Sequence, residues 1–354
     1  MSAEAADIAF PNLGIFISEL PKGFTIGGFT IACYGIIMAL SMMAGLWIVC
    51  VQAKRTGQKT ETYIDFALYA IVFSLIGARL YYVAFSWDSY KNDLWQIFNT
   101  RGGGMALYGS VIAAIITAAV YCKVKHQNFF LLADTSVAGL VLGQIIGRYG
   151  NFFNREAFGE YTDNLFAMRL RVDQVNPSNI TERMREHMQT VDGVSYIQVH
   201  PTFLYESLWN VMVFVLILVL TKKKKVNGEI FLLYMVGYAL GRVWIEGLRT
   251  DQLQIGATGI AVSQLLAGLI AVVGIGSWVI VRICLRKKES QGKDGAKRSV
   301  IEETEQECLE GVKEPVIEEM ERGSLGGAKR SVIEETEQEC LEKETIRDED
   351  AGGS

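Results

Sequence analysis

Histidine, proline and clustered cysteine are scarce in this chain of 354 residues. It has three histidines and five prolines, and its six cysteines are scattered without a CxxC pair or a Cys/His cluster. Structural zinc sites and disulfide frameworks need such clusters, so we expect neither. No basic segment precedes the first apolar run, which argues against a cleaved signal peptide. We expect any reaction catalysed by this chain to need no metal and no other cofactor.

Charged residues are also few, at 21% of the chain, against about 25% in ordinary soluble domains. Their distribution is uneven. Residues 289–354 hold 20 acidic and 9 basic side chains, whereas residues 1–288 hold 19 acidic and 25 basic ones. The first 288 residues are dominated by long apolar runs. This pattern excludes a soluble enzyme of the usual kind and a small secreted domain held together by disulfides.

Seven of the apolar runs are long enough to be membrane-spanning helices, since about 20 residues cross a hydrocarbon core of about 30 Å. We therefore expect an all-α integral membrane protein with about seven transmembrane helices, although three of the runs are short or interrupted. The expected spans are Phe24–Val51, Tyr63–Phe85, Met105–Tyr121, Phe129–Gly147, Phe203–Leu220, Ile230–Leu248 and Ala261–Leu285.

Basic residues in the connections predict the orientation of these helices. The first, third and fifth connections and the end of the last helix are rich in lysine and arginine, including the run Lys222–Lys225. The alternate connections contain few basic residues. The positive-inside rule then places the N-terminus outside and the C-terminus in the cytoplasm. The connection Asn151–Val199 is polar and long, and we expect it to form a small extracytoplasmic head.

Two regions of different character are expected, a membrane domain of residues 1–288 and an acidic tail of residues 289–354. Within the tail, the 16 residues Gly295–Glu310 recur without change as Gly327–Glu342. The tail is charged and free of aromatic residues, so it cannot bury a core, and we expect it to be disordered. A repeat that binds a partner is the alternative interpretation.

Three arginines lie inside expected spans, where ionisable residues are costly and point to function. Arg79, Arg242 and Arg148 lie 18, 13 and 20 residues beyond the inner ends of their helices. At about 1.5 Å per residue, these are depths of roughly 27, 20 and 30 Å from the inner surface. All three guanidinium groups are therefore expected in the outer half of the membrane.

Three further polar groups are expected at the same level, namely Glu246, Glu206 and Tyr108. Arginine is always charged and binds phosphate oxygens in pairs, so the set predicts a site for an anionic group such as a lipid phosphate. For Arg79 a second interpretation is equally open, because an arginine near a helix end can reach the interface or pair structurally without a catalytic role.

The most distinctive stretch is Gly147–Gly159, which reads GRYGNFFNREAFG. It resembles the prolipoprotein diacylglyceryl transferases of bacterial plasma membranes and matches every fixed position of their pattern G-R-x-G-N-F-x-N-x-E-x-x-G. The resemblance covers about residues 10–288 and leaves out the repeated tail. It also includes Tyr34-Gly35, Gly77-Ala78-Arg79-Leu80, His200-Pro201, Tyr205-Glu206, Tyr238, Arg242, Glu246, Arg249 and Asp251.

The resemblance implies a reaction and its partners. Such enzymes transfer the diacylglyceryl group of phosphatidylglycerol to the lipobox cysteine of a prolipoprotein signal peptide, release glycerol phosphate, and work in the plasma membrane toward its outer leaflet. The implied catalytic residues are Arg148, Arg242, Tyr108 and Glu156. The two arginines would bind the phosphate and stabilise charge on the leaving group. The other implied binding or pocket-shaping residues are Tyr34, Asn151, Asn154, Gly159, Tyr238, Glu246, Arg249 and Arg79.

One position departs from the family. Many members have a histidine where this chain has Tyr108. Tyrosine titrates near pH ~10 and is a poor base at neutral pH, whereas a thiol titrates near ~8.5. We expect proximity and a thiol pKa lowered by arginine to provide most of the activation, with Tyr108 as a hydrogen-bond donor or positioning group.

Rival functions are a transporter and a non-enzymatic scaffold for anionic lipid. A transporter needs polar groups near the midplane and access from both faces, whereas the charged residues here lie mainly in the outer half of the expected spans. A scaffold would use the acidic tail as a docking arm. An intramembrane serine protease is disfavoured because the chain has no GxSxG motif.

Overall fold

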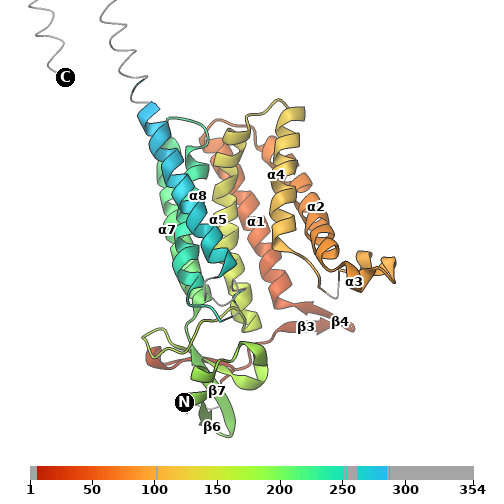
Figure 1. Cartoon of the computed structure of the whole chain (residues 1–354), viewed down its shortest axis with the longest axis vertical. Helices are drawn as coiled ribbons and strands as arrows, with labels where there is room; N and C mark the ends of the chain where they lie inside the picture. Colours follow the sequence, from red (N-terminus) through yellow and green to blue (C-terminus); the bar gives the residue numbers. More distant parts are fainter. Residues whose placement is uncertain (1–5, 101–102, 251, 253–260, 285–286, 288–354) are drawn as a thin grey trace, which may run out of the picture. The chain divides into compact units, whose positions relative to one another are not determined.

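The computed structural model describes residues 6–100, 103–250, 252, 261–284 and 287. The predicted acidic tail 289–354 therefore lies outside the described residues. Residues 1–278 form one compact unit, and residues 279–354 form a second. The first unit is mostly helical (Figure 1).

Six helices are long and apolar enough to cross a membrane, which is consistent with a multi-pass membrane protein. They are α1 (Cys33–Arg55), α2 (Thr60–Phe85), α4 (Leu107–Val124), α5 (Phe129–Asn154), α7 (Thr202–Leu220) and the last helix, Val262–Cys284. A further helix of 18 residues, α8 (Glu229–Glu246), is apolar except for Glu229, Arg242 and Glu246. Five of the expected spans coincide with helices to within three residues at each end.

Small residues allow the helix backbones to approach each other closely. A Cβ added to Gly45 of α1 would lie 2.9 Å from the carbonyl oxygen of Gly139 of α5. In the same way, Gly77 of α2 faces Gly109 of α4, and an added Cβ would lie 2.7 Å from the Gly109 oxygen. Such contacts stabilise helix pairs in lipid, where apolar burial gives little driving force. They pair α1 with α5 and α2 with α4.

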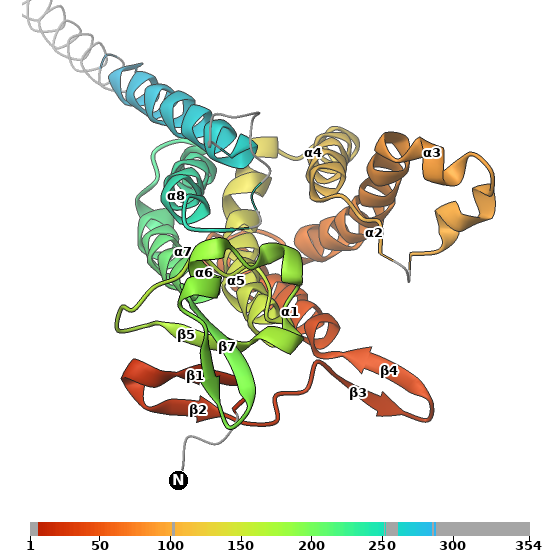
Figure 2. The same cartoon turned by 60° about the horizontal axis from the view of Figure 1, so that its bottom comes forward.

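A five-stranded sheet, built from two strands before α1 and three strands between α5 and α7, corrects the all-α expectation. Its order is β2-β1-β5-β7-β6 and all neighbours are antiparallel. The strands are β1 (Ile8–Phe10), β2 (Ile15–Ile17), β5 (Met168–Arg171), β6 (Gln189–Val191) and β7 (Val194–Val199). Figure 2 shows β1 and β2 beside β5 and β7. Its fully buried residues include Ile8, Leu170 and Ile197, so this part has a core of its own.

The first helix begins later than expected, because the first residues of the expected span form a β-hairpin. Strands β3 (Gly23–Ile26) and β4 (Phe29–Ala32) pair in antiparallel fashion. The turn between them is Gly27-Gly28, with φ of +56° and +81°. Positive φ at both positions is typical of the type I′ turn that joins two-residue hairpins. The expected helical start at Phe24 is therefore wrong, and α1 starts at Cys33.

Helix α5 ends later than expected, at Asn154 instead of Gly147. The next residue, Arg155, takes the left-handed conformation (φ +52°) that ends many helices. Most of the polar motif is therefore helical, although its composition predicts a loop. Two short helical segments, α3 (Trp87–Tyr90) and η2 (Leu94–Phe98), follow α2, and α6 (Glu182–Glu186) lies between β5 and β6.

Candidate active site

Three arginines and two glutamates from three helices form one charged cluster. Arg148 of α5 makes an ion pair of 2.6 Å with Glu206 of α7. Arg242 of α8 lies 2.7 Å from Glu246 and 3.5 Å from Glu206. Arg249, just after α8, lies 3.8 Å from Glu206 and 3.9 Å from Glu246. We call these five residues the arginine cluster.

The arginine cluster carries three positive and two negative charges. Its glutamate side chains are only 6% and 8% exposed, whereas the arginine side chains are 14–20% exposed. The carboxylates therefore lie behind the arginines and hold them in place. Each guanidinium has five N–H donors in a planar fork. The arrangement is suited to a further anion, because the arginines are the more accessible partners and each has a planar set of N–H donors.

A small recess next to the cluster is lined by aromatic and polar side chains. Tyr238 of α8 lines it together with Arg242 and Glu206, and the remaining lining residues are Trp209, Asn210, Gly241 and Ile245. The indole nitrogen of Trp209 donates to the carbonyl of Gly237, which fixes α7 against α8.

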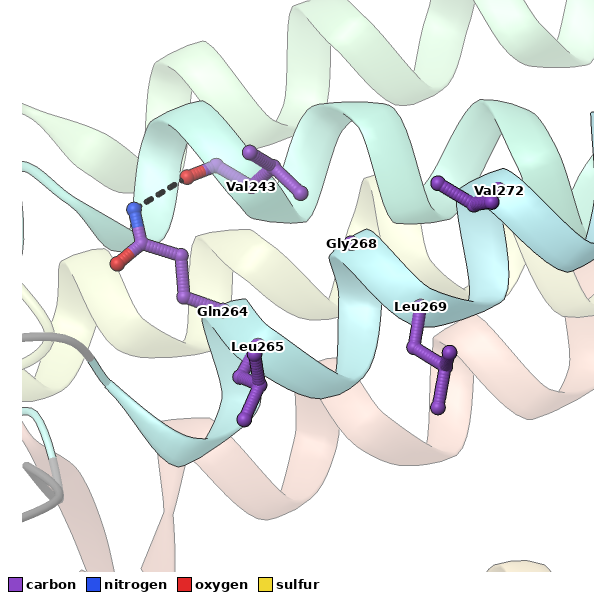
Figure 3. A pocket seen from close by; sticks show the side chains of 6 residues that line it. All are labelled: Val243, Gln264, Leu265, Gly268, Leu269 and Val272. Carbon is purple, nitrogen blue, oxygen red and sulfur yellow. Dashed lines mark hydrogen bonds between the residues drawn. The ribbon is translucent and has the colours of Figure 1, made fainter.

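An apolar groove follows the last helix and includes Val243, the residue after Arg242 in α8 (Figure 3). Its volume is about 510 Å³, and its lining residues are Val243, Gln264, Leu265, Gly268, Leu269 and Val272. The amide of Gln264 donates to the carbonyl of Val243 at 2.7 Å, and Ser263 donates to Glu246 at 2.6 Å. These two bonds join the last helix to the charged end of α8. A charged site and an apolar channel therefore share one helix.

The end of α5 presents a third feature, a glutamate held by two asparagines. The side chains of Asn151 and Asn154 both donate to Oε1 of Glu156, at 3.0 and 3.3 Å. Glu156 is exposed and stands between two residues with left-handed backbone, Arg155 and Ala157. Its second carboxylate oxygen accepts no hydrogen bond from a described residue.

Tyr34, at the start of α1, packs against this segment. A Cβ added to Gly150 would lie 2.8 Å from the Tyr34 ring, so only glycine allows the tyrosine to rest on the helix backbone. Asn151 is the next residue along the chain. The packing therefore places the Tyr34 ring next to the asparagine–glutamate group.

Gly159 lies where three segments meet. Its N–H donates to the carbonyl of His200, and the next residue, Glu160, donates to the carbonyl of Leu248. Gly159 also forms a β-bridge with Arg249. A Cβ at Gly159 would lie 2.7 Å from the oxygen of Leu248 and 2.8 Å from Cβ of His200. The glycine thus lets the motif pack against the segment that holds Arg249.

One residue expected at the site, Arg79, is used elsewhere in the structure. Arg79 is buried and donates all five of its N–H groups to backbone carbonyls of the segment before α4, so it has no donor left for a phosphate. The acceptors are Gln96, Ile97, Asn99, Gly103 and Gly104. Tyr108, at the start of α4, is 50% exposed and makes no side-chain hydrogen bond with a described residue. Asp251 lies outside the described residues.

Glu206 belongs to the expected polar groups, and the structure adds one residue that was not expected, Ser263. Glu206 contacts all three arginines of the cluster, and Ser263 donates to Glu246. An acid inside an apolar helix was the available signal for Glu206. Nothing in the sequence distinguishes Ser263 from other small polar residues. No group of three or more His, Cys, Asp or Glu residues that could hold a metal occurs among the residues that the structure describes.

The apolar helices of membrane-spanning length are those of a multi-pass membrane protein, and its partly buried arginine cluster is suited to bind an anion. The model of the family "Prolipoprotein diacylglyceryl transferase" matches residues 21–280. A phosphatidylglycerol–prolipoprotein diacylglyceryl transferase of Clostridioides difficile is 39% identical over 265 residues, covering 75% of this chain and 95% of the relative. The relatives of the same name from Bacillus cytotoxicus and Listeria welshimeri are 40% and 39% identical, and the matches cover 92% and 90% of their lengths. The chain belongs to the prolipoprotein diacylglyceryl transferase family.

Proposed function

We propose that this protein transfers the diacylglyceryl group of phosphatidylglycerol to the lipobox cysteine of a prolipoprotein, the first step of lipoprotein maturation. The cysteine sulfur forms a bond to the terminal glyceryl carbon, and the bond from that carbon to the phosphate oxygen breaks. The products are a thioether and glycerol phosphate, and the thiol proton is released. The observation that carries the proposal is the arginine cluster beside an apolar groove.

The arginine cluster would stabilise the leaving group. A phosphodiester carries one negative charge, and a second develops on the phosphate as the bond to carbon breaks. Arg148 and Arg242 are held by carboxylates before the substrate arrives, so little reorganisation is needed. A well-placed donor in a site that excludes water can contribute on the order of 3 kcal/mol. Arg249 adds a third positive group at the same place.

The apolar groove would hold an acyl chain of the lipid. It begins at Val243, the residue after Arg242, and its side chains are aliphatic except for Gln264. A phospholipid whose phosphate lies on the arginines could therefore extend one tail along the last helix. This combination of an anionic head and an apolar tail matches a lipid better than a soluble phosphate ester.

Activation of the thiol would depend on positioning. Tyr108 replaces the histidine found in many relatives, and we assign it hydrogen bonding or positioning. We also assign Glu156 to the catalytic site, where its free oxygen can contact the substrate while Asn151 and Asn154 hold the other oxygen. A thiol with a pKa near ~8.5 is already partly ionised at neutral pH, and nearby arginines increase that fraction.

The topology proposed for this reaction is seven spans in the bacterial plasma membrane, with α8 counted in addition to the six apolar helices. The N-terminus and the sheet would be extracytoplasmic, and the C-terminus cytoplasmic. Support comes from the basic residues of the first, third and fifth connections, among them Lys54, Arg55 and the run Lys222–Lys225. The active site would then face the outer leaflet.

The direct test uses purified protein in detergent, phosphatidylglycerol and a lipobox peptide with one cysteine. Mass spectrometry measures the diacylglyceryl group added to the thiol, for the wild type, Arg148→Ala, Arg242→Ala and the matched control Arg185→Ala. Arg185 is an exposed arginine of α6. We expect transfer by the wild type and by the control, and no transfer by the first two variants.

Other outcomes would lead to different conclusions. Transfer that survives both cluster variants would keep the enzyme and contradict the assigned phosphate site. If the folded wild type transferred nothing from phosphatidylglycerol or other acidic lipids, the proposed reaction would be wrong.

A further inference from the structure

A buried aspartate, far along α5 from the arginine cluster, caps the first turn of α8. The side chain of Asp134 accepts hydrogen bonds from the backbone N–H groups of Gly228 and Phe231, both at 2.8 Å. It also accepts one from Nζ of Lys224 at 2.9 Å, and the residue is only 2% exposed. The first N–H groups of a helix have no partner within the helix and need an acceptor.

Helix α8 cannot supply this cap itself. Its N-cap residue is Gly228, which has no side chain and a left-handed backbone (φ +98°). Gly228 also lies close to α5, since an added Cβ would be 3.0 Å from the Phe130 ring. The carboxylate of one helix therefore takes the role that a serine or aspartate at the N-cap usually has. This is a link between two helices.

The spacing along the two helices makes this link relevant to the arginine cluster. Arg148 follows Asp134 by 14 residues on α5, and Arg242 follows Gly228 by 14 residues on α8. At 1.5 Å per residue both arginines lie about 21 Å beyond the link. Both then reach the same carboxylate, Glu206. A slip of one helical turn, about 5.4 Å, would remove Arg242 from Glu206.

Other contacts between α5 and α8 do less to fix this alignment. Val137, Ala138 and Val141 pack against Ile230 and Tyr234. Apolar packing is non-directional and opposes separation more than sliding. One hydrogen bond in this interface, from Gln144 to the Tyr234 hydroxyl at 2.9 Å, lies between the link and the arginines. Among the described residues, the bonds from Gly228 and Phe231 to Asp134 are therefore the main polar contacts that fix α5 against the start of α8.

We propose that Asp134 is a positioning residue, which fixes the axial alignment of α5 and α8 and thereby places Arg148 and Arg242 at one phosphate. The inference rests on the proposed function. It concerns a residue that touches neither the arginines nor the substrate.

The test compares KM for phosphatidylglycerol and kcat in Asp134→Leu, Asp134→Asn and two controls. Asp134→Leu removes both carboxylate oxygens, whereas Asp134→Asn keeps one oxygen as the acceptor for the N–H groups of Gly228 and Phe231. Lys224→Met removes only the charge partner, and Asp65→Leu removes an exposed acid from the corresponding end of α2. We expect Asp134→Leu to raise KM by about tenfold or more and to lower kcat. Asp134→Asn should raise KM less, and the controls should stay within about twofold of the wild type.

The KM distinguishes positioning from a general loss of stability. Partial unfolding lowers the apparent kcat in proportion to the folded fraction and leaves KM unchanged. If the recovered Asp134 variants showed a wild-type KM, the positioning role would be overturned. If Asp134→Leu did not fold, the same criterion would apply to Asp134→Asn. If the wild type itself lacked transferase activity, the proposed function would fail instead, and that result is visible before any variant is compared.

Discussion

Glu206 shows how much of the site depends on one side chain. It contacts arginines from α5, from α8 and from the segment after α8, and it is 8% exposed. Without it, three guanidinium groups would repel one another in a partly buried site. The carboxylate therefore permits a density of positive charge that the arginines alone could not maintain.

We predict that the Glu206→Gln variant has a less stable arginine cluster than the wild type but binds phosphate no more weakly. Loss of the negative charge of Glu206 makes the site more attractive to an anion, so KM for phosphatidylglycerol should not increase. The arginines lose their orientation, so kcat should fall. Removing one partner from a buried ion pair costs on the order of 3 kcal/mol, and the melting temperature should fall as well. Steady-state kinetics and thermal unfolding test this, and a higher KM with unchanged kcat would contradict it.

A second prediction concerns Gly159. In Gly159→Ala the new methyl group meets the backbone oxygen of Leu248 at 2.7 Å, so the segment carrying Arg249 must shift. We expect turnover to fall by one to two orders of magnitude, roughly, because small displacements of catalytic groups are costly.

The matched control for this prediction is Gly143→Ala on α5. There the nearest atom is the Ser41 oxygen at 3.6 Å, which is ordinary contact. This helical position should gain about 0.5–1 kcal/mol of stability and keep its activity. Equal activities of the two variants would show that the junction at Gly159 is not required.

Counting residues along a helix gives an expected height for an arginine but not the direction in which its side chain points. For Arg148 and Arg242 the height was sufficient, because α5, α7 and α8 pack together. Arg79 was expected at a similar height. Its helix α2 packs against α4, however, and its guanidinium donates to backbone carbonyls of the connection between these two helices. Only helix packing decides which way an arginine points, and a single sequence contains little information about it.

At the level of elements, we predict that Arg79 orders the connection between α2 and α4. Lysine has three donors on one atom and cannot reproduce five bonds from a planar group. In Arg79→Lys, the connection should become more sensitive to limited proteolysis, whereas KM for phosphatidylglycerol should change by less than about twofold. A large rise in KM with no change in proteolysis would instead return Arg79 to the substrate site.

Long helices were predictable and short strands were not. An apolar run of about 20 residues has few alternatives to a helix, and five predicted spans agree with the structure. The run from Phe24 includes a hairpin because Gly27-Gly28 favours a turn, a local signal hidden by the surrounding hydrophobicity. Strand β1 has three residues, and its partner β5 lies about 160 residues away, so no local pattern could identify the pair.

At the scale of the whole molecule, the junction between the sheet and the helices contains His200. Burial lowers the pKa of His200 below its usual value, and nearby Arg183 lowers it further, while Glu160 acts in the opposite direction. The unfolded chain therefore binds a proton more readily. The stability linked to this group is complete above about pH 6.5 and is lost as the pH falls through the lower folded-state pKa.

We therefore predict that the melting temperature falls more between pH 7.5 and pH 5.5 in the wild type than in His200→Asn. Thermal unfolding followed by tryptophan fluorescence at both pH values measures this difference. An equal fall in both proteins would show that other groups cause the pH dependence.

A last prediction concerns the acidic tail. The family match ends at residue 280, and the repeated segment lies beyond it. Removing residues 289–354 should leave turnover within about twofold of the full chain, as expected for a segment without a role in chemistry. A loss of activity in the membrane-inserted truncated protein would favour the partner-binding interpretation of the repeat.

The apolar groove along the last helix is open on one side, where Leu265 and Leu269 are about 60% exposed. If that side faces lipid, the substrate arrives by diffusion in two dimensions, and its relevant concentration is a mole fraction of the bilayer. Adding more vesicles of the same composition would then leave the rate per enzyme unchanged. Diluting phosphatidylglycerol with a neutral phospholipid would slow it. For such an enzyme, membrane composition sets the supply of substrate.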